Sequence, residues 1–391
     1  MVAILRAGSA LTAAALTFAL ADAPADLAGQ STAVFIRSER WLDPITGGIK
    51  GPVVIRIAGD RIAKVMPAAE YKGVGTLIDL GNSTILPGLI DAHVHLQIGG
   101  APNENARAIL RAGFTTVVDL GSTSDAVLRL RDRIASKEEE GPRILAAGKW
   151  IGTKNGICEF GGIGVAGGPD AFRARVRENV QAGADLTKVC VSTWLADAYA
   201  RPDGYEISDA ALDAVVDESH VAKRLVIGHA ISLGSVKAAM RAKVDGLAHG
   251  ALVDRATAEE LRDRGIFMIP TLASLAGAST DPASEALRRA IATAQKAGVR
   301  LVFGTDGGVL PHGQNAREFS ALVEAGIPAI EAIRSATISA ARVFALEQEV
   351  GAIAEGKVAD VVGVDGDPLR DVQALSRIVF VMHNGRIVRQ P

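Results

Sequence analysis

Hydrophobic and polar positions at the two ends of this 391-residue chain follow the pattern of short β-strands. Such runs lie at residues 34–36, 53–57 and 61–65, and again at 359–364, 378–382 and 387–388. Gly59-Asp60 and Asn384-Gly385 stand between neighbouring runs, where tight hairpin turns favour these residues. We expect residues 31–85 and 350–391 to pair into one small β-sandwich domain built from both chain ends.

Residues 86–349 show a different pattern, in which strand-like runs alternate with amphipathic helical runs. The predicted strands are residues 85–95, 115–119, 143–150, 185–191, 225–229, 246–249, 266–270 and 301–306. The predicted helices are residues 103–111, 125–136, 170–181, 209–223, 235–242, 257–263 and 284–296, with N-caps such as Ser208 and either Asp254 or Thr257. Eight strand–helix units over about 260 residues predict an α/β fold of the (β/α)8 TIM-like barrel type. A doubly wound sheet is the alternative, but no Gly-x-Gly-x-x-Gly follows the first strand.

Candidate chemistry gathers at the predicted carboxyl ends of the strands, where barrel enzymes carry their active sites. His93 and His95 end the first strand, and side chains two apart on a strand point to one face. His229 and His249 end the fifth and sixth strands, and Asp306 ends the eighth. Each histidine alone could be a packed core residue. Together they predict a ring of metal ligands, because imidazole is the commonest metal ligand among side chains.

Lys188 lies late in the fourth predicted strand, within Leu186-Thr187-Lys188-Val189-Cys190-Val191. The alternation places Val189 and Val191 toward the outer helices and the ammonium inside the barrel. A buried unpaired ammonium is costly. It could form an ion pair, act with a lowered pKa as a base, nucleophile or Schiff-base amine, or react with carbon dioxide to give a carbamate. Asp306 could cap a turn, or it could bind a metal and accept a proton from water.

Composition, charge and the leader indicate which classes of function and which compartment are compatible with the chain. The formal net charge is −2 and no basic cluster is present, so nothing indicates nucleic-acid binding. Cys158 and Cys190 are too few for a disulfide framework, nothing in the sequence pairs them, and no Cys-x-x-Cys predicts structural zinc. Residues 1–21 have the pattern of a signal peptide ending in Ala19-Leu20-Ala21, which predicts a periplasmic or secreted protein. The alternative is an Ala-rich leader on a cytoplasmic protein, and no stretch predicts a membrane span.

These residues resemble the metal-dependent amidohydrolase superfamily over nearly the whole chain after the leader. The resemblance rests on Leu86-Pro87-Gly88-Leu89-Ile90-Asp91-Ala92-His93-Val94-His95, on Gly304-Thr305-Asp306, and on the tail segments Val350-Gly351-Ala352-Ile353, Gly356-Lys357-Val358-Ala359-Asp360 and Gly366-Asp367-Pro368-Leu369. Gly183-Ala184-Asp185-Leu186-Thr187-Lys188 and His249-Gly250 are similar to the branch of imidazolonepropionases and Xaa-Pro or Xaa-Arg dipeptidases.

The resemblance implies a hydrolase with two divalent ions, most often zinc. His93, His95 and Asp306 would hold one ion and His229 and His249 the other, bridged by N6-carboxylated Lys188 and a hydroxide. Asp306 would carry a proton to the leaving amine of an amide in a dipeptide, an N-acyl amino acid or a related small molecule. The alternatives are a mononuclear cyclic-amide hydrolase of the imidazolonepropionase type, and a lactone or phosphotriester hydrolase. The intact ligand set argues against a scaffold protein without activity.

The substrate contacts are less defined than the metal ligands. Many members of this branch carry Gly-Gly-His after the third strand, whereas residues 152–162 of this chain contain no histidine. Lys154 in that loop could bind a substrate carboxylate or simply be solvated. His312, after the last predicted strand, matches a position near the substrate, and a structural role is the alternative. We expect a small-molecule substrate and a homo-oligomer.

Overall fold

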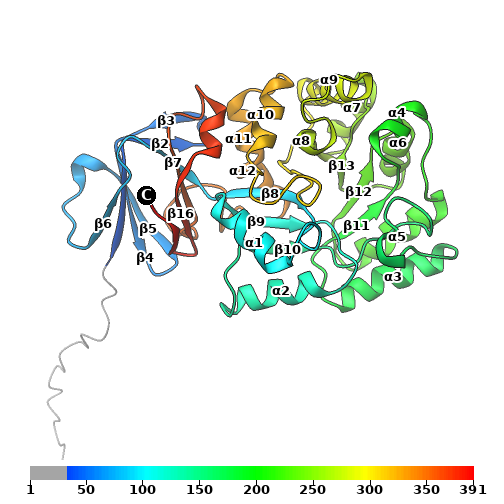
Figure 1. Cartoon of the computed structure of the whole chain (residues 1–391), viewed down its shortest axis with the longest axis horizontal. Coiled ribbons are helices and arrows are strands. Elements are labelled where there is room, and N and C mark those ends of the chain that lie inside the picture. The colour runs from blue at the N-terminus through cyan, green and yellow to red at the C-terminus, as the bar shows by residue number, and fades with distance from the viewer. Residues whose placement is uncertain (1–32) are drawn as a thin grey trace, which may run out of the picture.

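A computed structural model describes residues 33–391, so the expected leader lies outside the described residues. The two ends of the chain form two sheets, with strand orders β5-β4-β1-β6 and β17-β16-β15-β7-β2-β3 (Figure 1). The strands are β1 (Val34–Ser38), β2 (Arg40–Asp43), β3 (Gly48–Lys50), β4 (Val53–Ala58), β5 (Arg61–Pro67), β6 (Thr76–Asp79), β7 (Thr84–Pro87), β15 (Val361–Val364), β16 (Ile378–His383) and β17 (Arg386–Arg389). Short 3-10 turns are η1 (Ala68–Glu70) and η3 (Val372–Ser376).

Both predicted hairpins are confirmed, because β4 pairs with β5 across Gly59-Asp60 and β16 pairs with β17 across Asn384-Gly385. Strand β7 joins the two chain ends through its antiparallel pairing with β15. Residues of both ends also share one buried apolar cluster, which includes Ile55, Val361 and Phe380. The sequence pattern therefore located most strands of this region but missed β2, β3 and β6, and the sheets draw on both ends of the chain.

The middle of the chain carries parallel strands in two sheets, β10-β9-β8 and β11-β12-β13-β14. These strands are β8 (Leu89–Val94), β9 (Phe114–Asp119), β10 (Arg143–Ala146), β11 (Thr187–Cys190), β12 (Val226–Ala230), β13 (Gly246–His249) and β14 (Phe267–Ile269). The helices are α1 (Pro102–Arg111), α2 (Ala126–Ala135), α3 (Pro169–Gln181), α4 (Leu195–Ala200), α5 (Asp209–Val221), α6 (Leu233–Arg241), α7 (Arg255–Asp263), α8 (Leu272–Leu275), α9 (Pro282–Ala297), α10 (Arg317–Glu324), α11 (Ala329–Ser335), α12 (Ile338–Val343) and the 3-10 turn η2 (Phe160–Gly162).

Single parallel residue pairs continue the pairing beyond these sheets. Ile151 pairs with Val189 between the loop after β10 and strand β11, Met268 pairs with Leu301, and Val94 pairs with Gly307. The helices lie outside the strands (Figure 1). All seven predicted helices are present with shifted ends, and Ser208 and Asp254 accept the capping hydrogen bonds that mark helix N-termini. The fold is α/β with parallel strands, as expected.

Two predicted strands differ from the structure. The run 85–95 is divided at Gly88, because β7 pairs with β15 whereas β8 pairs with β9. The run 301–306 is not a regular strand and makes only single pairs at Leu301 and Gly307. Its ladder is interrupted because the Phe303 amide donates to the Ser335 carbonyl and the Thr305 amide donates to the Asp91 carboxylate. These two bonds take the N–H groups of Phe303 and Thr305 out of the ladder, whereas the Val302 N–H still donates to the Met268 carbonyl and the Phe303 carbonyl still accepts from Ala92.

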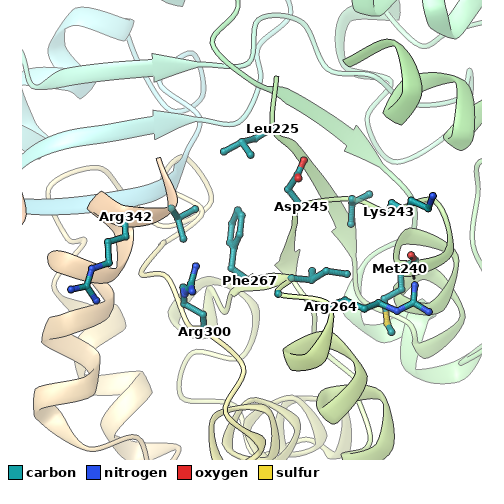
Figure 2. Close-up of a pocket in the computed structure, with 12 residues that line it drawn as sticks. Leu225, Met240, Lys243, Asp245, Arg264, Phe267, Arg300 and Arg342 are labelled. Carbon is teal, nitrogen blue, oxygen red and sulfur yellow. Dashed lines mark hydrogen bonds between the residues drawn. The ribbon is translucent and has the colours of Figure 1, made fainter. Parts of the chain in front are cut away.

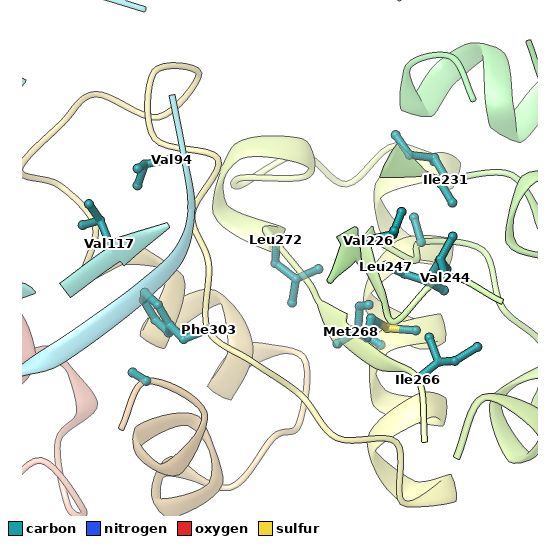
Figure 3. Packing of buried hydrophobic residues seen from close by; sticks show 14 of the residues in the cluster. Val94, Val117, Val226, Ile231, Val244, Leu247, Ile266, Met268, Leu272 and Phe303 are labelled. Atoms are coloured by element: carbon teal, nitrogen blue, oxygen red, sulfur yellow. The ribbon is translucent and has the colours of Figure 1, made fainter. Parts of the chain in front are cut away.

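Side chains of the parallel strands divide between two apolar clusters. The outer cluster packs the strands against the helices and includes Val94, Val117, Leu247 and Met268 (Figure 3). The inner cluster includes Ile90, Ile227 and Phe267, together with residues of α12. Alternation along each strand therefore assigns side chains to the inside or the outside. This division determines which polar side chains meet on the inner face of the strands.

Candidate metal centre

Strand β8 brings His93 and His95 to one point. The register with β9 shifts between Asp91 and Val94, so that Ala92 packs in the inner cluster and Val94 in the outer one. Such irregularities re-aim side chains next to active sites. The Nε2 atoms of the two histidines lie 3.2 Å apart. The His95 Nδ1–H donates to the Gly121 carbonyl at 3.0 Å, which leaves Nε2 of a neutral ring with its lone pair.

Asp306 completes a three-residue group with these histidines. Its Oδ1 atom lies 3.3 Å from His93 Nε2 and 3.2 Å from His95 Nε2, and the residue is 3% exposed. Asp306 has a φ of 58°, an uncommon conformation for a residue with a side chain. Gly304 permits the close approach to β8, because a Cβ there would lie 2.9 Å from the Cβ of His93. The Gly304-Thr305-Asp306 motif therefore places a carboxylate on the histidine pair.

His229 and His249 come from the ends of β12 and β13. Their ring centroids lie 4.5 Å apart, and those of His249 and His93 lie 5.1 Å apart. Leu247 packs in the outer cluster, so regular alternation would also send His249 outward. Instead His249 has a φ of 73° and lies beside the inner histidines. Ligand atoms of His93, His249 and Asp306 all lie within 4.8 Å of one another, which is compatible with one metal ion.

Lys188 is buried beside these groups, at 2% exposure. Val189 and Val191 pack in the outer cluster, as the alternation predicts. The Nζ atom has no hydrogen-bond partner among the described residues. Burial lowers the pKa of Lys188 to about 7, and its charge lowers the pKa values of His93, His229 and His249. Lys188 is therefore a buried amine that the protein alone leaves uncompensated.

The electrostatics of the cluster suit a cation. Burial, and after it the Lys188 charge, lowers the pKa of His229 to about 3. Burial likewise holds the pKa values of His93 and His249 well below the usual range, so the imidazoles are neutral, as metal ligands must be. Burial opposes ionisation of Asp306, but its contact with His95 and the nearby positive charge of Lys188 hold its pKa below the usual value. Neutral nitrogens around a carboxylate fit a divalent metal.

Asp91 supports this group from behind. It is fully buried and accepts hydrogen bonds from the Thr305 hydroxyl at 2.6 Å and the Asn315 amide at 2.7 Å. It also accepts the backbone N–H groups of His93 and Thr305 at 3.1 Å each. Asp91 thus connects the segment that carries Asp306 to the strand that carries His93. The sequence reasoning assigned it no role, although a carboxylate inside an apolar strand was the available signal.

Glu318 and Thr271 support His249 in a similar way. The Thr271 Oγ1 atom lies 2.6 Å from His249 Nδ1, and Thr271 has a φ of 51°. The next two residues, Leu272 and Ala273, donate their backbone N–H groups to the Glu318 carboxylate at 2.9 and 2.6 Å. Glu318 is fully buried, and burial raises its pKa to about 8. Sequence reasoning missed this chain of contacts, because its members are distant in sequence.

The loop after β10 covers one side of the cluster. Trp150 lies against His95, with ring centroids 5.3 Å apart, and Phe160 lies against Trp150 at 4.9 Å. Cys158 of this loop forms a disulfide with Cys190 at the end of β11, a pairing that nothing in the sequence indicated. The pairing of Ile151 with Val189 explains the disulfide, because it brings the loop to the end of β11.

The two predicted substrate residues have different environments. Lys154 is exposed on the loop, and no described contact joins its side chain to the histidine cluster. His312 donates from Nε2 to the Ile98 carbonyl at 2.9 Å, whereas its Nδ1 atom is buried without a partner in the described chain. The structure thus fixes the His312 ring between the Ile98 carbonyl and Gly307, next to Asp306, and shows no such contact for Lys154. Both substrate roles stay predictions.

A cavity of about 610 Å³ opens at the other ends of the strands (Figure 2). It lies at the amino ends of β12, β13 and β14, where Leu225, Asp245 and Phe267 line it. Lys243, Arg264, Arg300 and Arg342 stand at its rim. The candidate metal ligands lie at the carboxyl ends of the same strands, so this cavity does not belong to the histidine site.

None of the helices within residues 33–391 has both the length and the hydropathy that a membrane span needs.

Comparisons with known proteins show which enzymes this chain resembles. The ochratoxinase of Aspergillus niger is 26% identical over 272 residues, which cover 63% of this chain and 56% of that enzyme. A crystal structure of a Xaa-Pro dipeptidase with bound methionine in the active site is 28% identical, with a TM-score of 0.82 over 91% of this chain and 99% of the other. A prolidase complexed with N-methylphosphonate-L-proline is 26% identical, with a TM-score of 0.78 over 92% of this chain and all 100% of the other.

The match to the curated relative spans little more than half of that relative's length. The likeness to solved structures covers nearly the whole chain and indicates a TIM-barrel-like α/β fold. A profile of the Amidohydrolase family matches residues 84–388, which include every candidate metal ligand. The chain therefore belongs to the Amidohydrolase family.

Proposed function

We propose that this enzyme hydrolyses an amide bond in a dipeptide, an N-acyl amino acid or a related small molecule, with two divalent metal ions bound. The observation that carries the proposal is the close grouping of His93, His249 and Asp306, with His95, His229 and the buried Lys188 beside them. We also propose that the parallel strands close into a (β/α)8 barrel and that the sheets of the chain ends form a β-sandwich. The single residue pairs between the sheets support the closed barrel.

Six residues would hold the metals. His93, His95 and Asp306 would bind one ion, because their donor atoms lie within about 3.3 Å of one another. His229 and His249, whose rings are neighbours, would bind the other. Zinc is the metal whose preference for imidazole and carboxylate ligands fits this set.

Lys188 would complete the set as a carbamate. Its neutral amine attacks carbon dioxide, a nitrogen–carbon bond forms, and one proton leaves, so that a buried amine becomes a carboxylate. This change removes the cost of the unpartnered Nζ atom, because the new oxygens can bind both cations. The mononuclear alternative, of the imidazolonepropionase type, would leave Lys188 as an unmodified amine without a partner.

Divalent ions at these positions would lower the pKa of a water molecule and polarise the scissile carbonyl. Asp306 lies where it can accept the proton of the attacking water at a carboxylate oxygen and deliver it to the leaving amine. Thr271 and the Gly121 carbonyl hold His249 and His95 by their Nδ1 atoms, and such outer contacts fix the orientation of metal-binding imidazoles. The same centre could also attack a lactone or a phosphotriester.

The direct experiment is a substrate panel tested on the purified protein with zinc supplied. The panel contains dipeptides, N-acyl amino acids, lactones and phosphotriesters, and Asp306→Asn is the inactive control. We expect release of an amino acid from at least one amide substrate, with the rate lost in the control. Hydrolysis of lactones or phosphotriesters without any amide hydrolysis would refute the proposed substrate class.

We further propose that the protein is exported and forms a homo-oligomer. The leader pattern and the Cys158–Cys190 disulfide agree with export, because disulfides persist mainly in oxidising compartments. Fusing residues 1–32 to a reporter would test export by the reporter's appearance outside the cytoplasm. Light scattering of the purified protein would test the oligomer, and a monomeric mass would contradict it.

A further inference from the structure

The most accessible histidines of the metal centre lie beside tryptophans. His95 is 7% exposed and His229 is 5% exposed, whereas His93 and His249 are each 1% exposed. Trp150 lies 5.3 Å from His95 between ring centroids, and Trp194 lies 6.0 Å from His229. Two of the three tryptophans of the chain therefore stand next to the two imidazoles nearest to solvent.

The aromatic side chains continue outward from the centre into solvent. Trp150 is buried, but Phe160, which packs on it with ring centroids 4.9 Å apart, is 39% exposed. Trp194 is 44% exposed, and its ring meets His229 edge to face. Exposed aromatic rings beside a buried polar centre offer large apolar faces on which an aromatic group can pack. Phe160 thus exposes an apolar face next to the aromatic neighbour of the candidate metal ligand His95, and Trp194 exposes one next to His229.

The surrounding loops hold these rings in place. Trp150 packs on Gly121, where a Cβ would lie 2.4 Å from the indole. The disulfide between Cys158 and Cys190 fixes the loop of Phe160 to the strand that leads to Trp194. Ile98, Ile157 and Ile163 pack around Trp150 and this disulfide. The surroundings of Trp150 are therefore apolar, and the disulfide anchors the loop that carries Phe160.

We propose that Phe160 and Trp194 form an aromatic subsite that binds an aromatic group of the substrate next to the scissile bond. The inference rests on the proposed function, because it assigns a substrate class to the same metal centre. The ring of the substrate would cover the exposed faces of both side chains. Stacking and removal of apolar surface from water would then stabilise the complex. The exposed Lys154 on the same loop contributes no contact to the described subsite.

The test compares four substrates that differ only in their apolar groups: N-acetylalanine, N-acetylphenylalanine, N-benzoylalanine and N-benzoylphenylalanine. For the wild-type protein with zinc, we expect kcat/KM to be at least about ten-fold higher for an aromatic substrate than for N-acetylalanine. Phe160→Ala and Trp194→Ala should each reduce this ratio several-fold. Leu77→Ala, at a residue of β6 that is 41% exposed, is the matched control and should keep the ratio.

A binding measurement separates this inference from the proposed reaction. Quenching of tryptophan fluorescence by N-benzoylalanine and by N-acetylalanine reports binding even if no substrate is cleaved. Calorimetry should show that N-benzoylalanine binds the wild-type protein more tightly than N-acetylalanine does, and that Trp194→Ala loses this difference. This result would support the subsite even if no amide is hydrolysed. Cleavage of all four substrates at similar kcat/KM would overturn the subsite and leave the proposed function intact. A changed oligomeric mass in Trp194→Ala, with unchanged selectivity, would instead assign the rings to a contact between subunits and overturn the subsite.

Discussion

Replacing Glu318 with glutamine should change how protein stability depends on pH. Glu318 is fully buried, its carboxyl group accepts the N–H groups of Leu272 and Ala273, and burial raises its pKa from the ordinary 4.5 to about 8. Between these two pH values the folded protein keeps a proton on Glu318 that the unfolded chain has released. The free energy of unfolding therefore falls as pH rises through this window, because the folded state binds more protons.

The size of the effect follows from the same values. A pKa raised from 4.5 to about 8 corresponds to roughly 5 kcal/mol of stability lost by pH 8, at 1.36 kcal/mol for each pKa unit. Glutamine does not titrate, but it offers one carbonyl oxygen for two N–H groups, which costs about 1–3 kcal/mol. Glu318→Gln should thus be less stable than wild type at pH 5 and equal or more stable at pH 8.

Urea denaturation at a series of pH values between 5 and 8 measures the free energy of unfolding of both proteins and the pH at which the two values become equal. The difference between wild type and variant is the relevant quantity, because other titrating groups contribute equally to both proteins. Glu324→Gln, at an exposed residue of the same helix α10, is the matched control and should follow wild type. If the curves of wild type and Glu318→Gln run parallel across this range, the account of Glu318 as a buried, protonated side chain is wrong.

Three further predictions test the centre and its support. Thr271→Val removes the hydroxyl 2.6 Å from His249 Nδ1, so metal affinity measured by chelator competition should fall about 10- to 100-fold, and Thr271→Ser should restore most of it. Gly121→Ala places a Cβ against the Trp150 indole at a φ of 125°, so we expect the midpoint of thermal unfolding to fall. An unchanged midpoint would contradict the close packing of Trp150 on Gly121. Lys188→Ala should abolish hydrolysis and release one metal ion per chain, with partial rescue by small carboxylic acids; full activity in this variant would exclude a bridging carbamate.

The sequence pattern predicted most of the elements that position the site. Strand alternation correctly buried Lys188 opposite Val189 and Val191, because these neighbours pack against the helices. The paired histidines of β8 and the position of Asp306 also came together as the spacing indicated. Such features depend on local periodicity, which a single sequence contains.

Other features depend on contacts between distant residues, and the sequence could not reveal them. Alternation alone would have turned His249 outward, and only its positive φ brings the ring inside. The segment 301–306 failed to form a strand because Asp91 and Ser335 take its N–H groups. The Cys158–Cys190 disulfide likewise follows from the pairing of Ile151, in the loop after β10, with Val189 of strand β11.

Metal content of the purified protein tests the central claim most directly. Elemental analysis after dialysis against metal-free buffer should find two divalent ions per chain, and activity should vanish with a strong chelator and return with zinc. The His229→Ala and Lys188→Ala variants should each retain about one ion. One ion per wild-type chain would favour the mononuclear arrangement, and a protein without bound metal that stays fully active would contradict the account.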